Sequence, residues 1–258
     1  MIGNRPPRGC DCRGSSREAL SSPLMPWLSP YQRQERRRRR MLAACAFLLG
    51  LIVFTLADRW LFFHLRAPSL PAVEGKDWYR MLRIAGYLPT WLVVGAIVLA
   101  ADAAAARREA RSGVPRERAP TWWSRGVLLI LAPALGGLAA ELLKVLFGRR
   151  RPIDNAVADG VYVWDGPFPT LRHLADGYHG GYGLPSSHAG VAFAAACIIG
   201  RLWPGACLPA FALAVGCGIT RLLAGAHFAS DVYVGAVAGY AVALGLWAMH
   251  RRGEELRS

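Results

Sequence analysis

Six long apolar segments, separated by polar stretches, account for most of the chain. They cover about 41–63, 84–106, 122–143, 189–203, 206–223 and 232–249. Because a helix needs about 20 apolar residues to cross a bilayer, this pattern predicts six transmembrane helices. The fourth segment is short for a span unless His188 and its neighbours begin the helix.

Aromatic residues mark the ends of these segments. Tryptophans are typical of the membrane–water interface, and here they lie in or near segment ends. They are Trp60, Trp91, Trp122, Trp123, Trp203 and Trp247. Between the first two segments, residues 67–83 mix aromatic and apolar residues with charges. This stretch fits a short interfacial helix and a plain loop equally well.

Positive charge is concentrated in three of the polar stretches. The net charge of +14 is that of many nucleic-acid-binding proteins, but the arginines do not form a binding face. Arg36–Arg40 precede the first segment, 107–118 separate the second and third, and Arg251 and Arg252 follow the last. Cytoplasmic loops of membrane proteins carry such an excess, so these stretches are predicted to be cytoplasmic. No nucleic-acid partner is predicted.

These patterns define the predicted organisation. Residues 1–40 are expected to be a basic, disordered cytoplasmic tail, 41–250 the membrane domain, and 251–258 a cytoplasmic C-terminal tail. The predicted fold class is all-α, an integral membrane six-helix bundle with a disordered N-terminal tail. The cysteines add no metal or disulfide pattern, because Cys10 and Cys12 form a lone CxC and the other four lie in apolar segments.

Three polar blocks lie at the ends of apolar segments, where ionisable side chains are costly and mark functional sites. In the orientation set by the arginines, all of these ends face the extracytoplasmic side. The blocks are therefore predicted to form a single pocket. Their polar residues are Lys144, Arg151, Ser186, Ser187, His188, Arg221, His227 and Asp231.

The cations of the blocks suit a phosphate. Phosphoryl transfer spreads negative charge over three oxygens, so its catalysis depends on positioning and on fixed positive charge. Lys144, Arg151 and Arg221 supply that charge, although each also fits a side chain snorkelling from a helix end. Arg149 and Arg150 are also compatible with binding anionic lipid head groups.

The serines and histidines suggest a reaction. Ser186 and Ser187 at a helix start present N–H and hydroxyl groups to an anion, although an ordinary helix cap explains them too. A helix through His227 and Asp231 would place them one turn apart, so that the carboxylate accepts the Nδ1 proton and Nε2 becomes a nucleophile. His188 would protonate the leaving oxygen. An interfacial histidine and a helix-capping aspartate are the plainer alternatives.

Residues around the blocks carry weaker signals. Glu141 lies three residues before Lys144 and fits a helical ion pair. Trp164 and Phe168 fit contact with a lipid tail, a lid over the site, or packing on the solvent side. Neighbouring acid and histidine side chains lack the spacing of a metal site, so no metal is predicted. They are His173, Asp176 and His179.

Taken together, the blocks resemble the type 2 phosphatidic acid phosphatase (PAP2) and haloperoxidase superfamily. That family's pattern is K-x6-RP, then PSGH, then SR-x5-H-x3-D. Here KVLFGRRRP begins at Lys144, LPSSH ends at His188 and TRLLAGAHFASD ends at Asp231. Ser187 replaces the family's usual glycine and Thr220 its serine. The blocks cover 144–231, and the six-helix layout extends the resemblance to about 41–250.

The resemblance implies a role for each block. His227 would attack phosphorus and form a phosphohistidine, Asp231 would orient it, and His188 would act as general acid and then activate water. The phosphate-binding residues would be Lys144, Arg151, Ser186, Ser187 and Arg221. Membrane members of the family need no metal or other cofactor and act on lipid phosphates or diphosphates.

We therefore expect a membrane-embedded phosphatase in a bacterial inner membrane, with its site on the periplasmic face. Phosphatidic acid, phosphatidylglycerophosphate, undecaprenyl diphosphate and a lipid A phosphate all fit, because the blocks contact the phosphate and not the lipid. The expected partners are that lipid and the bilayer, and no oligomeric state is predicted. The alternatives are a lipid phosphotransferase, a soluble-type vanadium haloperoxidase, and a transporter or structural membrane protein with a decayed site.

Overall fold

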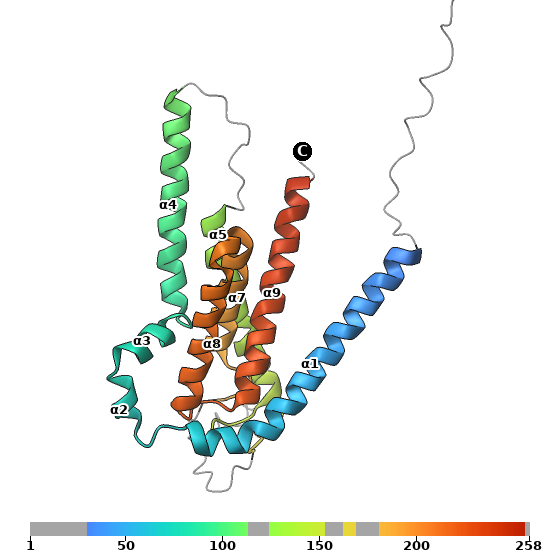
Figure 1. The fold of residues 1–258 in the computed structure, drawn as a ribbon, viewed down its shortest axis with the longest axis vertical. Coiled ribbons are helices and arrows are strands. Elements are labelled where there is room, and N and C mark those ends of the chain that lie inside the picture. The colour runs from blue at the N-terminus through green and yellow to red at the C-terminus, as the bar shows by residue number, and fades with distance from the viewer. Residues whose placement is uncertain (1–29, 113–123, 153–161, 169–180, 256–258) are drawn as a thin grey trace, which may run out of the picture. The chain divides into compact units, whose positions relative to one another are not determined.

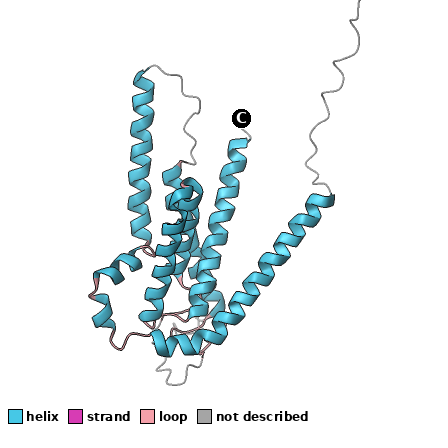
Figure 2. Ribbon diagram, viewed as in Figure 1, coloured by secondary structure: helices cyan, strands magenta, loops and turns pink. Residues whose placement is uncertain are grey.

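A computed structural model describes residues 30–112, 124–152, 162–168 and 181–255. Within these ranges the chain is helical apart from connecting turns and two isolated β-bridges (Figure 2). The chain divides into two compact units, Met1–Cys45 and Ala46–Ser258, and the boundary falls inside the first helix. The second unit contains all of the predicted polar blocks.

The helices follow the predicted order (Figure 1). The described elements are α1 (Pro30–Leu65), α2 (Leu70–Glu74), α3 (Asp77–Ile84), α4 (Leu88–Ser112), α5 (Arg125–Phe147), α7 (Ser187–Leu202), a short 3-10 helix (Pro204–Ala206), α8 (Cys207–Leu223) and α9 (Ala229–Glu255).

Five of the described helices are long and apolar enough to cross a membrane, and α7 is a shorter apolar helix. The five spans are Arg33–Leu65, Leu88–Ser112, Arg125–Phe147, Pro204–Leu223 and Ala229–Glu255. All six predicted segments are thus helical, which confirms an all-α integral membrane fold.

Two helix ends differ from the prediction. Helix α1 begins at Pro30, so Arg36–Arg40 lie in its first turns and do not belong to a disordered tail. Arginine, glutamine and glutamate are good helix formers, and Arg39 pairs with Glu35 one turn away. Helix α9 likewise continues to Glu255. The rest of the predicted N-terminal tail, 1–29, lies outside the described residues.

Helix α7 is the core of the second unit. Helices α5, α8 and α9 all pack against it, and most of its residues are buried. These residues are small, including Ala189, Ala192 and Ala194, and small side chains let helices approach closely in a membrane. A helix enclosed by other helices need not match the bilayer thickness, so a short helix is compatible with this position.

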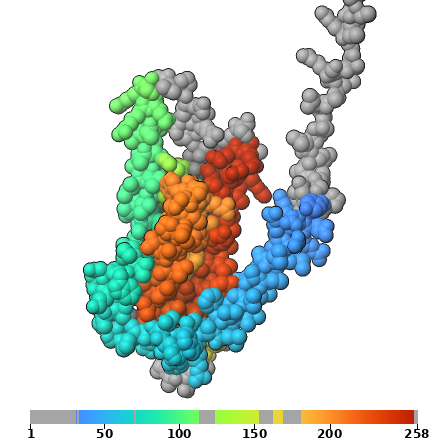
Figure 3. All heavy atoms as spheres, viewed as in Figure 1, coloured from blue at the N-terminus to red at the C-terminus, as the bar shows by residue number. Residues whose placement is uncertain are grey.

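The outer helices expose apolar side chains. Figure 3 shows the outer surfaces of α4 (green) and α8 (orange). Val93 and Ile97 of α4, and Leu208 and Ile219 of α8, are exposed. Such surfaces fit contact with lipid tails.

The polar stretch between the first two spans forms α2 and α3, which decides between the helix and loop interpretations. Tyr79 is fully buried, whereas its neighbours Trp78 and Met81 are exposed. Helix α3 packs against α8. This contact brings the 77–84 segment close to the end of α8 that carries Arg221.

Helix direction determines which ends meet. Helices α5 and α8 end, and α7 and α9 begin, at the same end of the second unit (Figure 1). The C-terminal ends of α4 and α9 lie toward the opposite end (Figure 1). These helix ends carry Arg107 with Arg108 and Arg251 with Arg252. The three polar blocks therefore share one end of the bundle.

Candidate functional site

Direct hydrogen bonds join the three polar blocks. Lys144 Nζ of the first block donates to Ser187 Oγ of the second at 2.7 Å. The Ser186 N–H of the second donates to the backbone oxygen of Asp231 in the third at 2.9 Å. The structure thus brings together the residues that the sequence analysis assigned to one pocket.

A tight turn after α5 positions the arginines. Gly148 caps the helix with φ 63°, a left-handed conformation that favours glycine, and its N–H donates to Lys144 O at 2.8 Å. The chain beyond the turn bridges to Trp164 and Tyr182. The Arg151 N–H donates to Gly181 O at 3.2 Å, which fixes the backbone of that arginine beside the second block.

His227 is buried just before α9. Its Nδ1 lies 2.8 Å from the backbone oxygen of Gly183 but 3.9 Å from Asp231 Oδ2. The prediction that one helical face carries His227 and Asp231, with the carboxylate as the acceptor, is wrong, because α9 begins only at Ala229. A carbonyl oxygen accepts and does not donate, so Nδ1 carries the proton and Nε2 keeps its lone pair.

The surroundings of His227 keep it neutral. Burial lowers the pKa of its imidazole well below the usual range, and the charges of Arg221, Arg151 and Lys144 lower it further. The hydrogen bond to Gly183 acts in the opposite direction but does not reverse the shift. A neutral imidazole among three cations can attack an anion that those cations bind.

Three polar atoms of the site are buried without a hydrogen-bond partner among the described residues. They are Ser186 Oγ, His188 Nε2 and Arg221 Nε. A buried polar group without a partner costs about 1–3 kcal/mol. Ser186 is the N-cap residue of α7, yet its side chain makes no capping bond, which disagrees with the ordinary-cap interpretation. A ligand rich in acceptor oxygens would satisfy the serine and arginine donors.

Lys144 is held by two side chains. Its Nζ donates to Glu141 Oε1 at 2.8 Å, as the spacing of the two residues predicted. Ser187 Oγ accepts from Lys144 and donates to Glu141 at 2.5 Å. The hydroxyl that replaces a family glycine therefore fixes the ammonium group at the pocket.

A second buried cluster, missed by the sequence analysis, supports Asp231. Arg149 is only 3% exposed, donates to Ser230 Oγ at 2.9 Å and forms a close ion pair with Asp231. Asp58 of α1 accepts from the Ser230 N–H at 2.8 Å and from the Tyr162 hydroxyl at 2.8 Å. Asp231 Oδ2 accepts from the Phe228 N–H at 2.8 Å.

This cluster corrects the lipid interpretation of the arginine run. Burial lowers the pKa of Arg149 to about 10, and the charges of Asp58 and Tyr162 oppose the change. Arg149 is therefore still charged at neutral pH and is bound inside the protein. Arg150 pairs with Asp165 at 2.8 Å. An acid within an apolar segment was the signal that would have found Asp58.

Other candidates lie at the margin. Trp164 and Phe168 are exposed. Three residues whose spacing predicted no metal site lie outside the described residues: His173, Asp176 and His179. Among the residues that the structure describes, no group of three or more His, Cys, Asp or Glu is placed to hold a metal ion.

The comparison with protein families agrees with the geometry. The model of the PAP2 superfamily matches residues 125–254. The chain belongs to the PAP2 superfamily. Neither the search of curated proteins nor the search of solved structures found a match. The PAP2 match contains all three polar blocks and begins at α5, so Asp58 and helices α1 to α4 lie outside it.

Proposed function

We propose that this PAP2 protein hydrolyses a lipid phosphate or diphosphate at the site. The observation that carries the proposal is a buried, neutral His227 within the field of three cations, Lys144, Arg151 and Arg221. Cations placed around a phosphate stabilise the charge that its oxygens carry in the transition state. The buried donors of Ser186 and Arg221, which have no partner among the residues that the structure describes, supply further contacts for phosphate oxygens.

The proposed mechanism has two steps. His227 Nε2 attacks phosphorus, and the bond from phosphorus to the lipid oxygen breaks with its electron pair on that oxygen. That oxygen takes a proton from His188, whose protonated form is disfavoured by burial and by the neighbouring cations and is favoured by the negative charge of the bound phosphate. Water then attacks the phosphohistidine and gives a proton to His188. This hydrolysis breaks the bond from phosphorus to Nε2 and releases inorganic phosphate. Gly183 keeps Nδ1 protonated at rest, and Asp231 stabilises the positive charge that develops on the ring.

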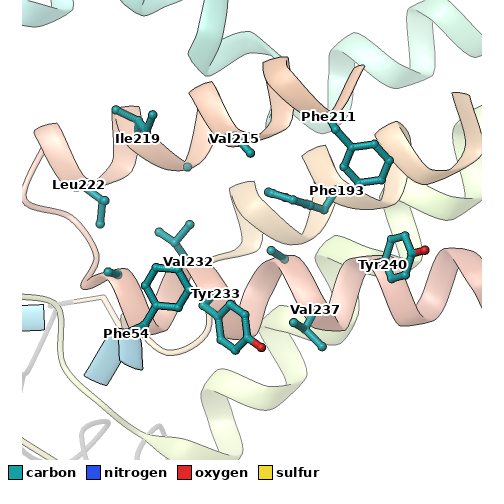
Figure 4. Close-up of a pocket in the computed structure, with 13 residues that line it drawn as sticks. Phe54, Phe193, Phe211, Val215, Ile219, Leu222, Val232, Tyr233, Val237 and Tyr240 are labelled. Atoms are coloured by element: carbon teal, nitrogen blue, oxygen red, sulfur yellow. The ribbon is translucent and has the colours of Figure 1, made fainter. Parts of the chain in front are cut away.

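An apolar pocket beside the site supports a lipid substrate. A cavity of about 410 Å³ lies between α7, α8 and α9, with Phe54 of α1 at its side (Figure 4). Leu222 and Val232 in its wall directly follow Arg221 and Asp231. From Phe211 to Leu222 the wall is about 16 Å long, roughly one leaflet of the 30 Å hydrocarbon core. A hydrocarbon chain fits a pocket of this composition and length.

The arginine distribution supports an orientation. The C-terminal ends of α4 and α9 lie opposite the site (Figure 1) and carry four arginines, Arg107, Arg108, Arg251 and Arg252. The positive-inside rule places the cytoplasm at that end. On this basis the site faces the extracytoplasmic side, which is the periplasm for a bacterial inner-membrane protein.

A substrate panel tests the function. Purified protein in detergent is incubated with phosphatidic acid, phosphatidylglycerophosphate, undecaprenyl diphosphate and a lipid A phosphate, with and without EDTA. We expect phosphate release from at least one lipid, unchanged by EDTA and inhibited by orthovanadate. If every lipid stays intact, or if the phosphate moves to an added acceptor lipid and none is released, the hydrolase proposal is wrong.

The pH dependence reports the state of His227. Burial and the neighbouring cations lower the pKa of the His227 imidazole. His227 should therefore remain neutral and nucleophilic below pH 6.5, which is the ordinary pKa of a histidine side chain. We expect kcat/KM to fall on the acid side with a midpoint below pH 6.5. The second pKa of the substrate phosphate, measured by ³¹P NMR, is used to correct this profile for ionisation of the substrate. An acid limb above 6.5 would contradict the assignment of His227 as the nucleophile.

A further inference from the structure

Helix α3, which precedes the family match, carries an arginine with an unsatisfied donor. Arg83 Nη1 donates to Glu74 Oε1 at 3.1 Å, but its Nε is buried and has no partner among the described residues. The Nε of Arg221, a predicted phosphate ligand, is in the same condition. An arginine left with a buried free donor suits an anionic ligand.

Three contacts hold α3 and the turn after it against the site. The buried Tyr79 hydroxyl donates to Thr220 O at 3.4 Å, next to Arg221. The Cys217 thiol lies 3.9 Å from Arg83 O and 4.0 Å from His188 O, so it contacts the backbone of both residues. A Cβ added at Gly86 would lie 2.9 Å from His188 Cβ, so only glycine allows this approach.

Arg83 lies on the His188 side of the site. The Tyr87 ring contacts the His188 ring edge-on, with centroids 5.6 Å apart, and Arg83 Cζ lies 5.8 Å from the Tyr87 centroid. In an in-line displacement the attacking nitrogen and the leaving oxygen are on opposite sides of phosphorus. Because the proposed mechanism has His227 attack and His188 protonate the leaving oxygen, Arg83 lies on the side that the mechanism assigns to the leaving group.

We propose that Arg83 binds a phosphate on the leaving group, so that the preferred substrate is a lipid diphosphate. The inference rests on the proposed function and names its substrate class. A leaving group that is an alcohol offers a guanidinium no charge to bind, whereas a lipid monophosphate offers an anion with several acceptor oxygens.

The reaction of a diphosphate is balanced at the same residues. His227 Nε2 bonds to the terminal phosphorus, and the bond from that phosphorus to the bridging oxygen breaks with its electron pair on the oxygen. His188 protonates the bridging oxygen, and the lipid monophosphate leaves with its charge held by Arg83. Water then cleaves the phosphohistidine to inorganic phosphate.

Arg80 provides a matched control on the same helix. Arg80 is exposed, and its Nε donates to Glu74 O at 2.9 Å. Arg80 and Arg83 therefore share Glu74 as a partner, whereas Arg83 is the less exposed of the two. If Arg83 served only to anchor α2 to α3, or to attract anionic lipid, substitution of Arg80 should have a comparable effect.

The test compares a prenyl diphosphate with the monophosphate of the same chain length, in wild type, Arg83→Gln, Arg83→Lys and Arg80→Gln. We expect Arg83→Gln to lower the ratio of kcat/KM for diphosphate over monophosphate by roughly tenfold to a hundredfold. Arg83→Lys should recover part of the ratio because it keeps the charge, and Arg80→Gln should keep the wild-type ratio.

Several outcomes would overturn the inference. If Arg83→Gln lowers both activities equally, Arg83 has a structural role, and if Arg80→Gln changes the ratio as much, the effect is general electrostatics. If the wild type cleaves the monophosphate but not the diphosphate, the substrate assignment is wrong while the proposed function stands. If the wild type cleaves neither, nor any lipid of the panel, the proposed function itself fails.

Discussion

Replacing His227 with glutamine will lower phosphate release by at least about a thousandfold, since removal of a nucleophile leaves only the catalysis due to binding and fixed charge. Glutamine is chosen because its amide can still donate to Gly183 O, the acceptor of Nδ1. The fold should therefore be kept. The measurement is kcat for the preferred lipid, together with the thermal unfolding midpoint in detergent.

His64→Gln is the matched control, because His64 lies on α1 and its Nδ1 contacts a backbone oxygen one turn away, Trp60 O at 2.8 Å. It should keep wild-type activity. Brief reaction with ³²P-labelled substrate and an alkaline quench should give an acid-labile phosphoprotein in wild type and none in His227→Gln. A His227→Gln protein that folds and still releases phosphate at more than about a tenth of the wild-type rate would exclude the mechanism.

The second large effect is on stability. Arg149→Met should lower the free energy of unfolding by about 3–5 kcal/mol, because it leaves the carboxylate of Asp231 buried without its cation. The two side chains are 3% and 0% exposed, so solvent cannot replace the lost partner. The measurement is the unfolding midpoint in detergent, with protein yield from membranes as a second measure.

Arg125→Met serves as the comparison for this effect. Arg125 pairs with Asp102 between α4 and α5, but these side chains are 52% and 23% exposed. A pair this accessible contributes about 0–1 kcal/mol, so the midpoint should change little. Equal losses in the two variants would show that Arg149 does not have the structural role inferred from its burial.

The sequence predicted the helices and the meeting of the blocks because both depend on long-range regularities. Apolar length defines each span, and alternation of direction brings the ends with Lys144, His188, Arg221 and Asp231 to one side. These inferences needed no knowledge of side-chain contacts. For the same reason they could not assign partners within the site.

The sequence-based predictions failed where a side chain bonds to a backbone atom or where neighbouring residues are of the same type. The acceptor for His227 is the carbonyl of Gly183, which has no signature in the sequence. In a run of three arginines, the sequence does not show which one pairs with Asp231; in the structure the chain turns at Gly148 and Arg149 forms that pair. Arg83 escaped notice because a short, mixed segment fits a helix and a loop equally well.

The contact between Asp58 and Ser230 sets a lower limit on the size of a fragment that keeps the site intact. The family match begins at residue 125. Asp58 of α1, outside that match, accepts hydrogen bonds from both the N–H and the hydroxyl of Ser230, which precedes Asp231. A fragment cut at the family boundary would keep every motif residue and lose this anchor. Fragment expression, domain grafting and transplanting of the site into other scaffolds should therefore include the second half of α1.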